Sequence, residues 1–170
     1  RNADSMSCTS ESSRERESSR MREELEDARA IQLAMLPSAA PELGWLDLQG
    51  ISLPATEVGG DYYDFLTVDA NRMAVVVGDV AGHGVASGLL LSGVRAGLHL
   101  LRADLADPRA VVERLNLLVR DSGVSRLFMS LVVALFDRTT GKVQVVTAGH
   151  PPALRFRAAT IAIEHALHPA

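Results

Sequence analysis

The sequence predicts an α+β protein in which two consecutive helices pack on antiparallel strands. Three observations support this class. An apolar fraction of 47% in 170 residues is sufficient for one hydrophobic core. Two apolar segments joined by a short turn, 128–136 and 142–147, predict a hairpin. Two helical segments, 83–102 and one that starts at Pro108, follow each other directly, unlike the alternating strands and helices of a parallel α/β fold.

Residues 1–20 are rich in Ser, Arg and Glu and almost free of apolar side chains, so we expect a disordered tail or linker there. Residues 21–36 carry a helical stripe with spacings of four and three, at Met21, Leu25, Ala28, Gln32 and Met35. Pro37 ends this helix. Two interpretations remain open: the helix packs on its own domain, or it is a linker that dimerises or transmits a signal. The domain itself is assigned to residues 37–170.

The remaining elements follow from local patterns. Residues 45–53 alternate in polarity, and residues 72–78 contain an apolar, β-branched run, so both are predicted strands. Asp107 is a suitable N-cap for the helix that begins at Pro108. Two further short strands are expected at 153–156 and 160–164.

Composition excludes several classes of protein. Lys and Arg total 17 against 21 Asp and Glu, a net charge of −4, which argues against a nucleic-acid partner bound through phosphate contacts. The single cysteine, Cys8, excludes a disulfide framework and a cysteine zinc site, and it is not expected to be a nucleophile. No apolar run reaches about 18 residues, and the polar start has no signal-peptide character. We therefore expect a cytoplasmic protein without membrane insertion.

Three polar segments interrupt the apolar pattern, at 57–65, 78–84 and 148–152. Asp79 follows a buried strand, where a carboxylate is costly unless it is paired or bound to a cation. Asp61 follows Gly59 and Gly60, which allow close approach of the backbone. Mg²⁺ and Mn²⁺ prefer such oxygen ligands. The alternative is that Asp79 caps the next helix and Asp61 makes a turn.

Other readings of the same segments stay open. Residues 78–84 could form a phosphate-binding loop before a helix, although no Lys follows as it does in a P-loop. His83 and His150 are candidate acid–base groups, or histidines with only structural hydrogen bonds. Asn116 is expected in core or cap chemistry rather than in catalysis.

Five motifs in this order resemble the SpoIIE/RsbU-type branch of the PPM metal-dependent serine/threonine phosphatases, over about residues 28–156. They lie at 31–37, 54–65, 78–86, Asn116 and 148–152. The resemblance implies an α-β-β-α sandwich of two antiparallel sheets flanked by helices. It also implies an upstream sensor domain joined through a helical linker, which suits a homodimer formed through residues 21–36.

The resemblance further implies hydrolysis of phosphoserine on an anti-sigma antagonist protein, by a water that two Mn²⁺ or Mg²⁺ ions activate. The resemblance implies that Asp61 and Asp79 are the catalytic residues: Asp79 bridges the metal ions, the carbonyl of Val80 is a further ligand, and Asp61 binds the same metal directly or through a water. Supporting positions, just outside these ligands or in the same motifs, are Glu57, Gly59, Gly60, Asp64, Gly82, Gly149 and His150.

Two departures from the family pattern matter. Relatives outside this branch carry a histidine, proposed as proton donor, where this chain has Ala81, and His83 is not assigned that role. The family also places an Asp-Gly metal motif and another Asp after the Ala-Gly-His segment, whereas no Asp follows His150 here. We therefore expect a phosphatase domain that lacks its C-terminal part, with negligible turnover by residues 1–170 alone. The alternative is a non-catalytic binding or signalling module with the phosphatase fold.

Overall fold

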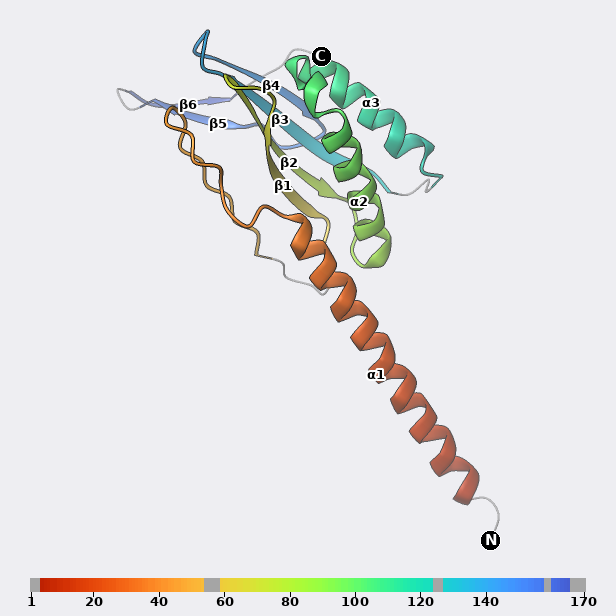
Figure 1. Ribbon diagram of the computed structural model, residues 1–170. Coiled ribbons are helices and arrows are strands. Elements are labelled where there is room, and N and C mark those ends of the chain that lie inside the picture. Colours follow the sequence, from red (N-terminus) through yellow and green to blue (C-terminus); the bar gives the residue numbers. More distant parts are fainter. Residues whose placement is uncertain (1–3, 54–58, 124–126, 158–159, 166–170) are drawn as a thin grey trace.

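The computed structural model describes residues 4–53, 59–123, 127–157 and 160–165. Its centre is a four-stranded antiparallel sheet in the order β1-β2-β3-β4, and a two-stranded antiparallel sheet, β5-β6, accompanies it (Figure 1). The strands are β1 (Asp61–Thr67), β2 (Arg72–Val80), β3 (Met129–Asp137), β4 (Lys142–Ala148), β5 (Leu154–Arg157) and β6 (Thr160–His165). The predicted hairpin is therefore confirmed, as are the strands at the β2, β5 and β6 positions.

Two helices and a short 3-10 turn cover one face of the four-stranded sheet (Figure 1). They are α2 (Val85–Leu100), η1 (Arg102–Ala106) and α3 (Pro108–Asp121). The predicted cap of α3 is confirmed, because the Asp107 side chain accepts a hydrogen bond from the Ala110 N–H at 3.2 Å. The core between helices and sheet is apolar and nearly closed to solvent, with Leu91, Leu98, Val111, Leu66, Val76 and Val133 at its centre.

The opposite face of the sheet is open. Strand residues alternate between the two faces, and in β1 the side chains of Tyr62, Asp64 and Leu66 are buried under the helices. Asp61 and its alternate neighbours therefore belong to the open face. On β2, Val77 is 38% exposed on that same side.

Helix α1 (Asp4–Met35) is longer than expected. Residues 4–20, which we predicted as a tail, are helical here: the segment has no Gly or Pro, and Arg and Glu favour helices. An exposed i,i+4 pair, Arg20–Glu24 at 3.1 Å, supports the helix. Its N-terminal part projects away from the sheet, whereas its C-terminal end lies against the body of the protein (Figure 1). The helix stops before Pro37, as predicted.

None of the described helices combines the length and the hydrophobicity that a bilayer crossing requires.

The predicted strand at residues 45–53 is wrong. Between residues 43 and 53 the backbone pairing consists of one isolated bridge, from Leu43 to Leu46. The side chains of Ile51 and Leu53 are 77% and 80% exposed. A strand needs a partner to satisfy its backbone groups, and no described strand pairs with this segment. Alternating polarity alone was therefore not sufficient evidence.

Candidate metal site and cleft

Asp61 and Asp79 lie directly opposite each other at the end of the β1–β2 ladder. The backbone N–H of Val80 donates to the carbonyl of Gly60 at 3.0 Å and so holds the two strand ends together. Directly opposed residues point to the same face, with Cβ atoms about 5 Å apart. Both aspartates are exposed on the open face, so their carboxylates can share one cation.

Gly60 gives this site its space. A Cβ at this position would lie 2.9 Å from Asp79 Oδ1 and even closer to the Val80 carbonyl oxygen, so a side chain cannot be accommodated without movement. Asp79 Oδ1 and the Val80 carbonyl oxygen thus lie beside a bare Cα, and Asp61 is opposite Asp79 in the strand register. These oxygen donors fit Mg²⁺ or Mn²⁺, and Mg²⁺ commonly uses one or two carboxylates together with waters and phosphate oxygens.

The glycine before this site is held by helix α1. The Gly59 N–H donates to Gln32 Oε1 at 3.0 Å, and Gln32 Nε2 donates back to the Gly59 carbonyl. The amide of Gln32 therefore satisfies both backbone groups of Gly59. The sequence placed Gln32 in the helical stripe and in the first family motif, at 31–37, but did not predict its contact with Gly59. The available signal was a polar residue in an otherwise apolar stripe.

Asp64 does not join Asp61 and Asp79. It lies on the helix-covered face, 5% exposed, where the Tyr62 hydroxyl donates to Asp64 Oδ2 at 2.7 Å and His99 Nε2 lies 2.9 Å from the same oxygen. Burial, and then the hydrogen bond to Asp64, raise the pKa of Tyr62 well above its usual value, so the phenol remains a donor. The expectation that Asp64 stands beside the metal ligands is therefore wrong.

Ser130 and His150 extend the row of polar residues. The β2–β3 register places Ser130 opposite Asp79, and Ser130 Oγ lies 2.8 Å from His150 Nδ1. A parallel bridge between Leu131 and Gly149 brings the residues before His150 alongside β3, and Gly149 adopts φ +65° there, a conformation that favours glycine. Sequence reasoning proposed His150 as a supporting residue and missed Ser130, since only the strand register reveals it.

These residues line one open cleft of about 480 Å³ on the uncovered face of the sheet. Asp61, Asp79, Ser130 and His150 form its polar side. Its apolar side comes from the strands and from the segment before β1, with Ile51, Leu53, Tyr63, Phe65, Val75 and Val77. A cleft of this size can take a phosphorylated side chain together with its flanking backbone.

Several other predicted residues lie apart from the cleft. Gly82 takes φ +95° in the turn between β2 and α2, and neither it nor the exposed His83 lines the cleft. The N-cap residue of α2 is Gly84 and no side chain caps the helix, so the alternative in which Asp79 caps it is wrong. Glu57 lies outside the described residues.

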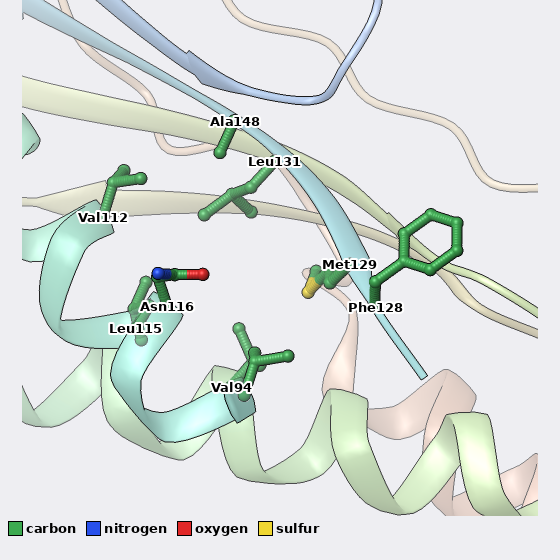
Figure 2. A pocket seen from close by; sticks show the side chains of 9 residues that line it. Val94, Val112, Leu115, Asn116, Phe128, Met129, Leu131 and Ala148 are labelled. Carbon is green, nitrogen blue, oxygen red and sulfur yellow. The ribbon is translucent and has the colours of Figure 1, made fainter. Parts of the chain in front are cut away.

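Asn116 faces a separate, smaller cavity of about 90 Å³ between α2, α3 and the sheet (Figure 2). Its amide points among apolar side chains, including those of Val94, Leu115 and Leu131 (Figure 2). Because these helices cover the opposite face of the sheet from the two aspartates, Asn116 is not part of the cleft.

Comparison with known proteins identifies the family of the chain. The family model for Stage II sporulation protein E (SpoIIE) matches residues 69–170, more than half of the chain. The chain belongs to the SpoIIE family. Phosphoserine phosphatase RsbU of Bacillus subtilis is 27% identical over 132 residues, which cover 78% of this chain and 39% of RsbU. The chain thus spans well under half of that relative's length. The resemblance predicted from the five motifs is confirmed.

Two solved structures support the fold. The SiaA-PP2C domain of Pseudomonas aeruginosa superposes with a TM-score of 0.61 at 27% identity, covering 77% of this chain and 54% of that one. The structure of the RsbU and RsbW domains of Rv1364c from Mycobacterium tuberculosis gives a TM-score of 0.53 at 32% identity, covering 61% of this chain and 29% of that one. The predicted α+β class and its phosphatase-type architecture are therefore confirmed for this SpoIIE-family chain.

Proposed function

We propose that this chain is the phosphatase domain of a protein that hydrolyses phosphoserine on a regulatory protein. The observation that carries the proposal is the meeting of Asp61, Asp79 and the Val80 carbonyl beside the bare Cα of Gly60. The similarity to a relative named phosphoserine phosphatase RsbU supports the same reaction.

The chain's own residues divide the work at this site. Asp61, Asp79 and the Val80 carbonyl would hold Mn²⁺ or Mg²⁺, Gly60 leaves the necessary room, and Gln32 holds the preceding peptide in place. The chemistry that such an ion supplies is activation of a water for attack on phosphorus and neutralisation of phosphoryl charge. The apolar side of the cleft, including Tyr63 and Val77, offers a surface for apolar parts of the phosphorylated partner.

The target we propose is a phosphoserine on a small regulatory protein of the anti-sigma antagonist type. In the related Rv1364c an RsbU domain and an RsbW domain belong to one protein, and the relative named RsbU is a phosphoserine phosphatase. The cleft is open to solvent, so an exposed loop of a folded partner can reach it.

A second candidate function is a phosphoserine-binding module without turnover. The observation that favours it is that no group of three or more His, Cys, Asp or Glu side chains suited to a metal occurs within the described parts of the chain. Such a module would bind the phosphorylated partner in the cleft and leave the phosphate in place.

The two functions are separated by Asp79→Asn in the protein expressed from its complete reading frame. We expect Mn²⁺-dependent phosphate release from a phosphoserine peptide to fall more than about 100-fold, because loss of a direct ligand costs more than loss of a group behind it. Mn²⁺ affinity, measured by calorimetry, should fall in parallel.

The matched control is Asp69→Asn, an exposed aspartate that pairs with Arg72 at the far end of the same two strands. This variant should release phosphate at the wild-type rate. Wild-type protein that binds the phosphopeptide but releases no phosphate would support the binding module instead. Asp79→Asn with full activity would contradict the proposed site.

A further inference from the structure

Beside the two aspartates the cleft holds a serine–histidine pair that the metal chemistry does not use. Asp61, Asp79 and Ser130 lie opposite one another on the neighbouring strands β1, β2 and β3. His150 is hydrogen-bonded to Ser130. We propose that His150, positioned by Ser130, donates a proton to the serine oxygen that leaves phosphorus. This inference rests on the proposed phosphatase function.

The chemistry requires a proton donor at this place. The oxygen that leaves a phosphoserine is an alkoxide, a very poor leaving group unless it is protonated as the bond breaks. Position 81, two residues after Asp79, is alanine and carries no labile proton. A donor has to come from elsewhere in the cleft.

Among the described residues that line the cleft, His150 is the one imidazole. The hydroxyl of Tyr63 already donates to backbone carbonyls, those of Pro37 and Gly50 at 3.3 Å. The hydroxyl of Tyr62 is bonded to Asp64 on the other face of the sheet. His99 is also on that face, beside Asp64. By elimination within this part of the structure, the proton is assigned to His150.

The Ser130 contact decides which ring nitrogen acts. When both ring nitrogens of His150 are protonated, Nδ1–H donates to Ser130 Oγ across 2.8 Å. The proton on Nε2 is then available for donation to the substrate. Ser130 sits on a strand in the middle of the sheet, with β2 and β4 on its two sides, so it gives the ring a rigid support. Ser130 is thus a positioning residue, and His150 is the group that reaches the reacting oxygen.

The step balances without another reagent. A water oxygen forms a bond to phosphorus while the bond from phosphorus to the serine oxygen breaks, and the electron pair of that bond stays on the serine oxygen. The serine oxygen takes the Nε2 proton of His150. The attacking water releases one proton to solvent, and His150 regains one from solvent, so the products are serine and inorganic phosphate.

The test compares two leaving groups in the full-length protein with Mn²⁺. For His150→Gln we expect kcat/KM on a phosphoserine peptide to fall about 100-fold or more, the usual contribution of a general acid. On p-nitrophenyl phosphate, whose nitrophenolate leaves without a proton, the loss should be at least about tenfold smaller. Ser130→Ala should shift the ratio of the two activities in the same direction, and Ser130→Thr, which keeps the hydroxyl, should restore it.

His83→Gln is the matched control, since this exposed histidine does not line the cleft; the ratio of the two activities should stay at the wild-type value. Thermal unfolding of each variant checks that it is folded. Equal losses on both substrates, or no loss on the peptide, in His150→Gln would overturn the assignment of His150. Wild-type protein without activity on either substrate would instead overturn the proposed phosphatase function, and the role of His150 with it.

Discussion

At the scale of single residues, Asp61 and Asp64 show how position on a strand separates two similar side chains. They are three residues apart on β1, so they point to opposite faces of the sheet. Asp61 is exposed beside Asp79, while Asp64 is buried and accepts hydrogen bonds that offset its desolvation. One carboxylate is therefore available to a cation, and the other stabilises the packing of β1 against α2.

The Tyr62–Asp64 contact leads to a prediction at this scale. Tyr62→Phe should lower the free energy of unfolding by about 1–3 kcal/mol at pH 7, because a buried acceptor loses its donor. The pKa of Tyr62 is raised in the folded state above the value of about 10 that holds in the unfolded chain. Its contribution is therefore fully present below pH 10 and is lost as the pH rises beyond it.

Urea unfolding at a series of pH values measures this effect. The unfolding free energies of wild type and Tyr62→Phe should converge above about pH 10. Tyr63→Phe is the matched control, since that hydroxyl bonds to backbone carbonyls outside the core. A wild-type to Tyr62→Phe difference that does not change with pH would contradict the assigned cause.

At the scale of elements, the C-terminal end of α1 contacts the body of the protein at two points. Gln32 holds Gly59, and the Ser92 hydroxyl on α2 lies 3.5 Å from Met35 Sδ. Gln32 and Met35 both belong to the predicted helical stripe. For this end of the helix, the structure favours packing on its own domain, the first of the two interpretations drawn from the sequence.

Gln32→Ala tests the connection between α1 and the aspartate pair. Both backbone groups of Gly59 would lose their partner, and the loop that leads into Asp61 would be less well held. We expect Mn²⁺ affinity to fall about 10- to 100-fold, the range for groups that orient metal ligands, as measured by calorimetric titration. Glu24→Ala, which breaks an exposed pair on the same helix, should leave the affinity as it is. Unchanged binding in Gln32→Ala would show that the contact has no part in the site.

At the scale of the whole molecule, one face of the sheet forms the core and the other carries the cleft. Helix α1 extends away from the sheet (Figure 1). At one end of the stripe Gln32 and Met35 contact the rest of the protein, and at the other end Met21 is 61% exposed. We expect the exposed end to support the homodimer predicted from the sequence.

Light scattering over a range of concentrations tests this association. Replacing Met21 and Leu25 together by Glu should weaken dimerisation by at least about tenfold, because two apolar side chains would no longer be buried between helices. Glu23→Gln, off the stripe, is the control and should dimerise as wild type does. A wild-type protein that is monomeric at all concentrations would contradict the prediction.

The sequence by itself determined the features that obey local rules. Strand composition, the Asp107 cap and the proline after α1 act within a few residues, and the order of the five motifs was sufficient for the family. Local rules also misled twice. Residues 45–53 alternate without a partner strand, and residues 4–20 were too polar for a core but still suitable for a helix.

Only the tertiary structure decided which residues meet. The strand register sets Asp61, Asp79 and Ser130 in one row. It depends on pairing between residues 18 and 51 positions apart, which no local pattern encodes. The same holds for Gln32 with Gly59 and for Ser130 with His150, which are 27 and 20 residues apart in the chain. The physical reason is that the sequence determines the chemical nature of each side chain, whereas which side chains lie close together depends on how the chain folds to bury one face of the sheet under its helices.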